Sequence, residues 1–161
     1  MKKLKFGVVG CGGQGGGWAR YLAKDEQVEL VALCDINPGH LNAVKKATGC
    51  QFTTQDFDEF LDQKMDAVVN ATPHYLHAPY SIKAMENEFH VFVEKPMAIT
   101  LHQCDEMIRT AKQNDVKLQV GHQRRLDSGS IKIKKAIDSG KIGDIYHMNL
   151  SARWYRSEMY F

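Results

Sequence analysis

The sequence predicts a doubly wound α/β fold, in which a parallel sheet carries helices on both faces. Short apolar runs alternate with amphipathic, helix-like segments along almost the whole chain. The runs are rich in valine, leucine and alanine, which is typical of strands buried on both faces. With 161 residues, 43% of them hydrophobic and 25% charged, the chain is long enough for one domain with a sizeable core and too short for two ordinary domains.

The expected strands and helices follow one another in alternation. Asn37 and Pro38 supply an N-cap and a first-turn proline for the second helix, which Gly49 ends. Asp56 and Glu59 have the spacing of a capping box for a third helix that ends near residue 63. We predict strands over residues 4–10, 28–34, 51–53, 67–71, 90–93 and 117–120, and further helices over residues 18–24, 39–47, 76–87, 101–114 and 130–139.

The end of the chain follows a different pattern. From Ile145 to Tyr155 the residues alternate between two faces, one of them mostly apolar, which predicts a half-buried strand of another sheet. We therefore divide the chain into a first domain, residues 1–144, and the start of a second domain, residues 145–161. A lone strand with an apolar face is unstable in water, so we expect this strand to pair with another copy or to be disordered.

Composition and charge narrow the classes of partner. Lysine and arginine number 21 against 19 aspartates and glutamates, which leaves a net charge of +2 and no strong field to attract nucleic acid or an anionic membrane. The apolar run 6–9 is too short for an export signal, and no run of about 18 apolar residues follows, so we expect a cytoplasmic protein with a small-molecule partner. The cysteines form no Cys-x-x-Cys pair and are expected to be reduced, mostly buried thiols rather than zinc ligands: Cys11, Cys34, Cys50 and Cys104.

A glycine-rich loop between the first expected strand and helix fits the pattern G-x-G-x-x-G. Gly10 permits a tight turn, Gly12 lets the backbone approach a pyrophosphate, and Gly15 lets the helix pack closely on the strand. With Gly13 and Gln14 the loop forms the N-terminus of a helix, which attracts anions. The alternative is a flexible turn without a ligand.

Asp35 ends the second expected strand, 20 residues after Gly15 (35 minus 15), which matches the spacing of the acid that binds the adenosine ribose in Rossmann-type dinucleotide domains. A carboxylate there repels a 2′-phosphate, and the following residues, Ile36 and Asn37, include no arginine to compensate. The sequence therefore favours NAD over NADP. The alternative for Asp35 is a turn or helix-capping acid.

Polar and turn-forming residues also follow the fourth and fifth expected strands, where open α/β sheets bind ligands. After the fourth strand come Ala71, Thr72 and Pro73, with His77 on the next helix; the alternatives are a Thr72 N-cap and a packing histidine. After the fifth strand come Glu94, Lys95 and Pro96, where a cis peptide bond is one option and a solvated lysine is the alternative to a functional one. Gln123 and Arg124, after the sixth strand, face either this crevice or solvent.

In order, the segments GVVGCGGQG, CDIN, NATPHYLHA, FVEKPMA, GHQRR and GKIGDIYHMNL resemble the glucose-fructose oxidoreductase, inositol dehydrogenase and rhizopine-catabolism family (Gfo/Idh/MocA). The resemblance covers essentially the whole chain. It implies that the glycine loop grips the pyrophosphate, Asp35 the ribose, and that Thr72 and Pro73 line the cofactor with His77 near the nicotinamide half. It further implies that Glu94 and Lys95 approach the nicotinamide ribose, that Lys95 touches substrate, and that Gln123 and Arg124 contribute.

Members of this family continue into a second α/β domain with an open, mostly antiparallel sheet, which supplies an Asp and a His for substrate binding and proton transfer and usually the oligomer interface. This chain ends before those positions. We therefore expect the cofactor-binding half of an NAD-dependent oxidoreductase that transfers hydride between nicotinamide and a secondary alcohol of a sugar or cyclitol, acting as a homo-oligomer. We expect the chain alone to bind NAD without oxidising an alcohol. The alternatives are a non-catalytic NAD-binding redox sensor and a methyltransferase.

Overall fold

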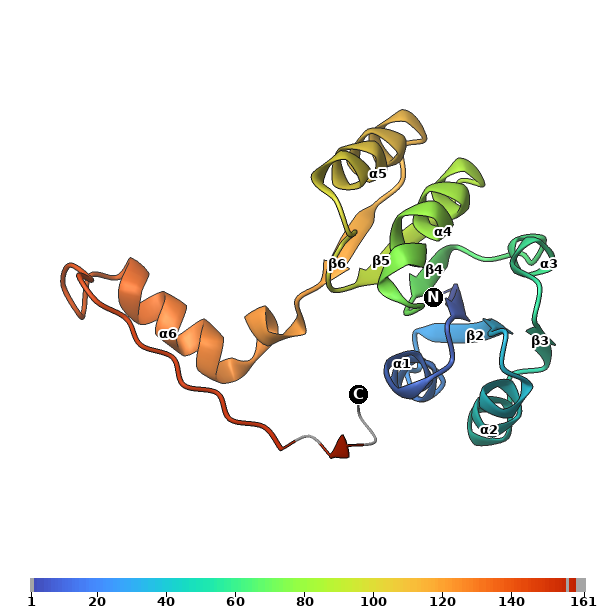
Figure 1. Cartoon of the computed structure of the whole chain (residues 1–161), viewed down its shortest axis with the longest axis horizontal. Coiled ribbons are helices and arrows are strands. Elements are labelled where there is room, and N and C mark those ends of the chain that lie inside the picture. The colour runs from blue at the N-terminus through green and yellow to red at the C-terminus, as the bar shows by residue number, and fades with distance from the viewer. Residues whose placement is uncertain (1, 156, 159–161) are drawn as a thin grey trace. The chain divides into compact units, whose positions relative to one another are not determined.

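The structure, a computed structural model, describes residues 2–155 and 157–158. Its centre is a six-stranded sheet in which every neighbouring pair is parallel, in the order β3-β2-β1-β4-β5-β6 (Figure 1). The strands are β1 (Leu4–Val9), β2 (Val28–Cys34), β3 (Phe52–Thr54), β4 (Ala67–Asn70), β5 (His90–Glu94) and β6 (Leu118–Gly121). The strand order reverses between β1 and β4, so the predicted doubly wound fold is confirmed.

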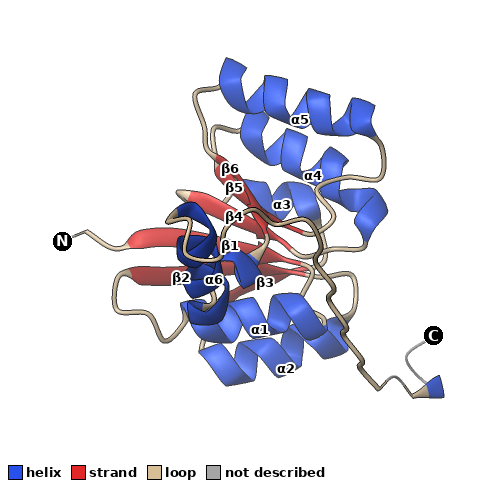
Figure 2. Cartoon of the chain, turned by 90° about the vertical axis from the view of Figure 1, so that its left-hand side faces the viewer, coloured by secondary structure: helices blue, strands red, loops and turns tan. Residues whose placement is uncertain are grey.

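Helices cover both faces of this sheet, with α1 and α2 on one face and α3, α4 and α5 on the other (Figure 2). These helices are α1 (Gly13–Leu22), α2 (Pro38–Thr48), α3 (Phe57–Leu61), α4 (His74–Glu86) and α5 (Leu101–Gln113). Contacts divide the chain into two compact units, residues 1–122 and residues 123–161. The sheet and these five helices lie in the first unit.

The core of the first unit has two layers because successive strand residues point to opposite faces. Val8 belongs to one buried cluster with Ala19 of α1 and Leu41 of α2. Its neighbour Val9 belongs to the other cluster, with Phe60 of α3. Both faces of β1 are thus buried at its carboxyl end, which explains why residues 6–9 form an apolar run without alternation.

The N-terminal ends of several helices differ from the sequence prediction; α4, for example, begins at His74 rather than at residue 76. The first helix begins at Gly13, five residues before the expected residue 18 (18 minus 13), because Gly15 is buried where a side chain does not fit and Gly16 is buried with little room, and this packing overrides the low helix propensity of glycine. The third helix has only half of the expected capping box. Asp56 caps the N–H groups of Asp58 and Glu59, but the Glu59 carboxylate accepts a hydrogen bond from Thr54 instead of reaching back to the cap.

The second unit contains η1 (Gln123–Leu126) and α6 (Ser128–Asp138), whose described residues have no buried side chain. The strand predicted over residues 145–155 is absent: these residues form neither helix nor strand and are all exposed. The physical reason is that a strand needs a hydrogen-bonded partner, and in the described part of the second unit no other strand exists. Residues 156 and 159–161 of the expected second domain lie outside the described residues.

No helix in the described part of the chain is both long and apolar enough to span a membrane. The cysteines in the same part of the chain are free, and three of them are buried, as expected: Cys11, Cys34 and Cys50. The described residues contain no cluster of three or more histidine, cysteine, aspartate or glutamate side chains that could hold a metal ion.

Candidate functional site

The glycine loop connects β1 to α1 at the carboxyl edge of the sheet. Gly10 has a positive φ of 83°, and a Cβ atom there would lie 2.6 Å from the Ala71 carbonyl oxygen. A Cβ atom on Gly15 would lie 1.6 Å from the Gly10 carbonyl oxygen. A side chain at either position is therefore excluded by the protein's own backbone.

Gly12 and Gly13 are in open space. A Cβ on Gly12 would meet only the His40 ring, at 3.8 Å, and a Cβ on Gly13 would meet no atom within 4 Å. Gly12 is also the N-cap of α1 and provides no side-chain hydrogen bond to the first turn, which has no acidic residue. The first N–H groups of a helix lack partners within the helix, so this open end can receive an anion close to the backbone.

Asp35 lies directly against this loop. Its Oδ2 atom accepts a hydrogen bond of 2.6 Å from the Cys11 N–H, and its Oδ1 atom accepts one of 2.7 Å from the Asn37 N–H. The His40 Nδ1 atom lies 3.3 Å from Oδ2. The carboxylate is held by β2, the loop and the start of α2 together, so its orientation is fixed. Asp35 thus forms a turn contact as in the alternative interpretation, but the cap of α2 is Asn37.

A hollow that is open to solvent lies beside Asp35 at the ends of β1, β2 and β4. Its lining includes Gly10, Asp35, Thr72 and Pro73, which the sequence had singled out. It also includes residues that the sequence interpretation missed: Ile36, Gln55, Tyr75, Leu76 and Tyr80. Ile36 is 81% exposed and Tyr75 62% exposed, and a large apolar side chain directly after a candidate ribose-binding acid is the signal that could have identified the first of them.

The turn after β4 is ordered by a buried side chain that the sequence did not single out. Asn70 is 1% exposed, and its amide donates to Ser81 Oγ and the His77 carbonyl, both at 3.1 Å. Its Oδ1 atom accepts a hydrogen bond of 2.6 Å from the Thr72 hydroxyl. Thr72 is therefore not the N-cap of α4, a position that Pro73 occupies.

His77 joins two turns at the same edge. Its side chain is buried, with Nδ1 2.6 Å from the Pro96 carbonyl oxygen and Nε2 2.9 Å from the Thr72 carbonyl oxygen. Both ring nitrogens are thus engaged with backbone of the turns after β5 and β4. The contact positions these turns relative to each other; a direct contact of His77 with a cofactor remains a prediction.

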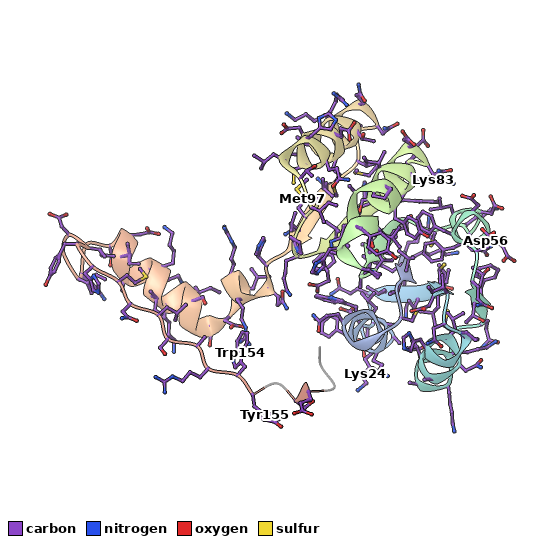
Figure 3. The ribbon with its side chains drawn as sticks, viewed as in Figure 1. Lys24, Asp56, Lys83, Met97, Trp154 and Tyr155 are labelled. Carbon is purple, nitrogen blue, oxygen red and sulfur yellow. The ribbon has the colours of Figure 1, made fainter. Side chains whose placement is uncertain are left out.

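The turn after β5 carries a buried acid followed by an exposed base. Glu94 is 4% exposed and accepts hydrogen bonds from Trp18 Nε1 at 2.7 Å and Gln14 Nε2 at 3.4 Å, both from α1, and from the Lys95 N–H at 3.2 Å. The Lys95–Pro96 peptide bond is cis. Beyond it, Met97 packs against the core (Figure 3). The exposed side chain of Lys95 therefore extends from a turn that is anchored on both sides.

The remaining candidates have their own surroundings. Gln123 and Arg124 lie in η1 of the second unit, where Arg124 Nη1 pairs with Asp127 Oδ2 at 3.0 Å, and their contact with a cofactor stays a prediction. Burial, with the nearby Asp35 carboxylate, raises the pKa of both Cys11 and Cys34 to about 12. These thiols therefore stay protonated near neutral pH and cannot act as nucleophiles in the site.

Residues 4–122 match an oxidoreductase family described as an NAD-binding Rossmann fold, Gfo/Idh/MocA. This chain belongs to that family. The match is to nicotinamide-dependent proteins, which disfavours the methyltransferase alternative.

Proteins with similar sequences include a dehydrogenase and a hydratase. Inositol 2-dehydrogenase from Salmonella typhimurium is 35% identical over 144 residues, which are 87% of this chain and 43% of the relative. 2,7-anhydro-N-acetylneuraminate hydratase from Mediterraneibacter gnavus is 33% identical over 153 residues, 95% of this chain and 40% of the relative.

Solved structures agree with the Gfo/Idh/MocA assignment. Scyllo-inositol dehydrogenase from Lactobacillus casei, solved with NAD(H) and scyllo-inositol, has a TM-score of 0.84 and 32% identity, covering 89% of this chain and 43% of that one. The WlbA dehydrogenase from Bordetella pertussis, solved with NADH and UDP-GlcNAcA, has a TM-score of 0.82 and 34% identity, and the match covers 90% of this chain and 42% of that one. The chain thus spans less than half the length of these relatives.

Proposed function

We propose that this chain is the NAD-binding part of an oxidoreductase that transfers hydride between nicotinamide and a secondary alcohol of a sugar or cyclitol. The observation that carries the proposal is the Asp35 carboxylate, whose Oδ2 lies 2.6 Å from the Cys11 nitrogen of the glycine loop, beside the open positions Gly12 and Gly13. A ribose-binding acid and a phosphate-binding loop are therefore in contact, as a dinucleotide requires.

Each group has a distinct part in binding. The N-terminus of α1 receives the pyrophosphate at Gly12, where the backbone is open to close approach. Asp35 accepts hydrogen bonds from the ribose hydroxyls, with Ala71, Thr72 and Pro73 beside it. These groups fix the adenosine half towards β2, so the nicotinamide half extends towards β4 and β5.

Lys95 is the candidate catalytic residue. No hydrogen bond or ion pair holds its ammonium group in the described part of the chain, and its side chain is exposed at the carboxyl end of β5. An ammonium group there can polarise a substrate hydroxyl and stabilise the alkoxide that forms as its proton leaves. The nicotinamide, when bound, supplies the redox chemistry, while the chain's own residues orient it.

The substrate class and surroundings of the whole protein belong to the same proposal. Relatives whose names state a cyclitol or whose structures contain a sugar nucleotide support a polyol or sugar substrate. We propose a cytoplasmic homo-oligomer without a nucleic-acid partner, and a substrate site that is completed outside residues 1–144. By this proposal the chain alone binds NAD and does not turn over an alcohol.

Titration of the chain with NADH, monitored by nicotinamide fluorescence, tests the proposal. Gly12→Val should fold normally, since its Cβ has room, but lose NADH binding because the side chain fills the space for the pyrophosphate. Gly17→Val is the matched control: a Cβ there meets no atom within 4 Å, and binding should be unchanged. Equal NADH affinity in both variants would contradict the loop assignment. Tight NADH binding by a longer form that oxidises none of a panel of polyols and sugars would favour the redox-sensor alternative.

A further inference from the structure

We infer that Asn70 is a positioning residue: it fixes the Thr72 hydroxyl so that this group can only accept a hydrogen bond from a bound dinucleotide. The inference rests on the proposed NAD site and adds to it a residue that acts through another. Asn70 is the last residue of β4, a strand whose residues are all buried and otherwise apolar. Thr72 lies in the turn that follows, is partly exposed, and lines the hollow beside Asp35.

The surroundings of Asn70 decide which end of its amide faces Thr72. One end lies 3.1 Å from the His77 carbonyl oxygen, an atom that can only accept, so this end must be the NH₂ group. The other end lies 3.3 Å from the Thr72 backbone nitrogen, which can only donate, so this end must be the oxygen Oδ1. Exchanging the two ends would place donor against donor and acceptor against acceptor. The amide therefore has one orientation.

This orientation also determines the role of the Thr72 hydroxyl. Its oxygen lies 2.6 Å from Asn70 Oδ1, and because Oδ1 carries no hydrogen, the hydroxyl must donate to it. A hydroxyl has a single hydrogen, so Thr72 has no donor left for a ligand and keeps a lone pair with which to accept. The ribose hydroxyls of a dinucleotide are donors that suit such an acceptor.

The backbone of Thr72 is held separately from its hydroxyl. The His77 Nε2 atom lies 2.9 Å from the Thr72 carbonyl oxygen, a contact that does not involve Asn70. Removal of the Asn70 amide should therefore free the hydroxyl to rotate while the turn stays in place. A purely structural role of Asn70 would instead lower the stability of the fold without a specific link to the Thr72 hydroxyl.

A double-mutant cycle in the full 161-residue chain tests this link. Asn70→Leu keeps the approximate shape of asparagine without its polar atoms, and Thr72→Val replaces the hydroxyl with a methyl group. Nicotinamide fluorescence gives the NADH dissociation constants, and urea denaturation gives the stability of each variant. Ser81→Ala is the matched control: Ser81 Oγ accepts from the same Asn70 amide at 3.1 Å, so its loss should lower stability and leave NADH affinity unchanged. Thr72→Ser keeps the hydroxyl and should bind NADH as the wild type does.

Asn70→Leu and Thr72→Val should each raise the NADH dissociation constant about fivefold, the size of one neutral hydrogen bond. In the Thr72→Val background, Asn70→Leu should add no more than about twofold. Where Asn70→Leu lacks a cooperative unfolding transition, Asn70→Ser, which keeps a polar group, takes its place in the cycle. Effects that multiply in the double variant, or an unchanged affinity in Thr72→Val, would overturn the positioning role and leave the NAD site intact. Absence of NADH binding by the wild type would instead overturn the proposed function.

Discussion

The described residues of the first unit, 2–122, and those of the second unit, 123–155 and 157–158, contain similar hydrophobic patterns but differ in how far their apolar side chains are buried. In the first region every strand of the sheet has at least one buried residue, and two apolar clusters fill the faces of the sheet. In the second region α6 has no buried residue, and the apolar side chains after it are exposed, including Tyr146 at 99% and Leu150 at 89%. The hydrophobic pattern of a segment indicates that it can form a strand or a packed helix. Whether it does so depends on a neighbouring strand or apolar surface against which it can pack.

The largest expected effect is a loss of the fold from one buried glycine. Gly15→Val places a Cβ within 1.6 Å of the Gly10 carbonyl oxygen, and backbone cannot move that far without separating α1 from β1. We expect no cooperative unfolding transition by circular dichroism. Gly129→Val, near the start of α6, is the control, since a Cβ there meets no atom within 4 Å. A folded Gly15→Val protein would contradict the close packing of the loop.

A paired substitution measures the difference between the two regions in free energy of unfolding. Phe60 is 0% exposed, and Phe60→Ala should lower the free energy of unfolding by about 3–5 kcal/mol. Leu150 is 89% exposed, and Leu150→Ala should change it by no more than about 0.5 kcal/mol. Urea denaturation gives both values. Similar losses in the two variants would show that Leu150 is buried in solution.

The third effect concerns the cofactor and should be confined to the first region. Asp35→Asn removes the charge that repels a 2′-phosphate, so the preference for NADH over NADPH, expected to be at least about tenfold, should largely disappear. Asp138→Asn in α6, where the carboxylate pairs with Lys134, should leave the preference unchanged. Fluorescence titration with both nucleotides measures it. A preserved preference in Asp35→Asn would remove Asp35 from cofactor recognition.

The smallest effect on the fold should come from deleting residues 145–161. A chain that stops after residue 144 lacks the exposed apolar segment but keeps every described strand, so its melting temperature and NADH affinity should equal those of the full chain. Light scattering should show that the full chain associates and the shortened one does not, because the exposed apolar side chains of Tyr146, Met148 and Leu150 favour contact with another copy. A strictly monomeric full chain would contradict the association.

The sequence predicted the sheet well because burial on both faces leaves a direct signature. Each of the expected strands in residues 4–120 is present with its limits shifted by no more than about one residue, and the glycine loop, Asp35 and the Glu94–Pro96 turn lie at the carboxyl edge as expected. Contacts between residues that are far apart in the sequence could not be predicted from it. Neither the Trp18–Glu94 hydrogen bond nor the bridge of His77 between two turns has a signal in spacing, because both depend on how α1 and α4 dock on the sheet.

The Trp18 Nε1–H donates a hydrogen bond of 2.7 Å to the Glu94 carboxylate, and the indole ring lies edge-on to Phe92. The fixed indole is also an intrinsic fluorescent reporter. Trp18 is about one helical turn after Gln14, so its emission originates beside the N-terminal end of α1, where we propose that the pyrophosphate binds. Reduced nicotinamide absorbs where indole emits, and energy transfer from Trp18 would therefore distinguish NADH from NAD⁺ without any added dye. The sequence has a second tryptophan, Trp154, and replacing it with phenylalanine would leave a single tryptophan, whose quenching under selective indole excitation would report nucleotide binding.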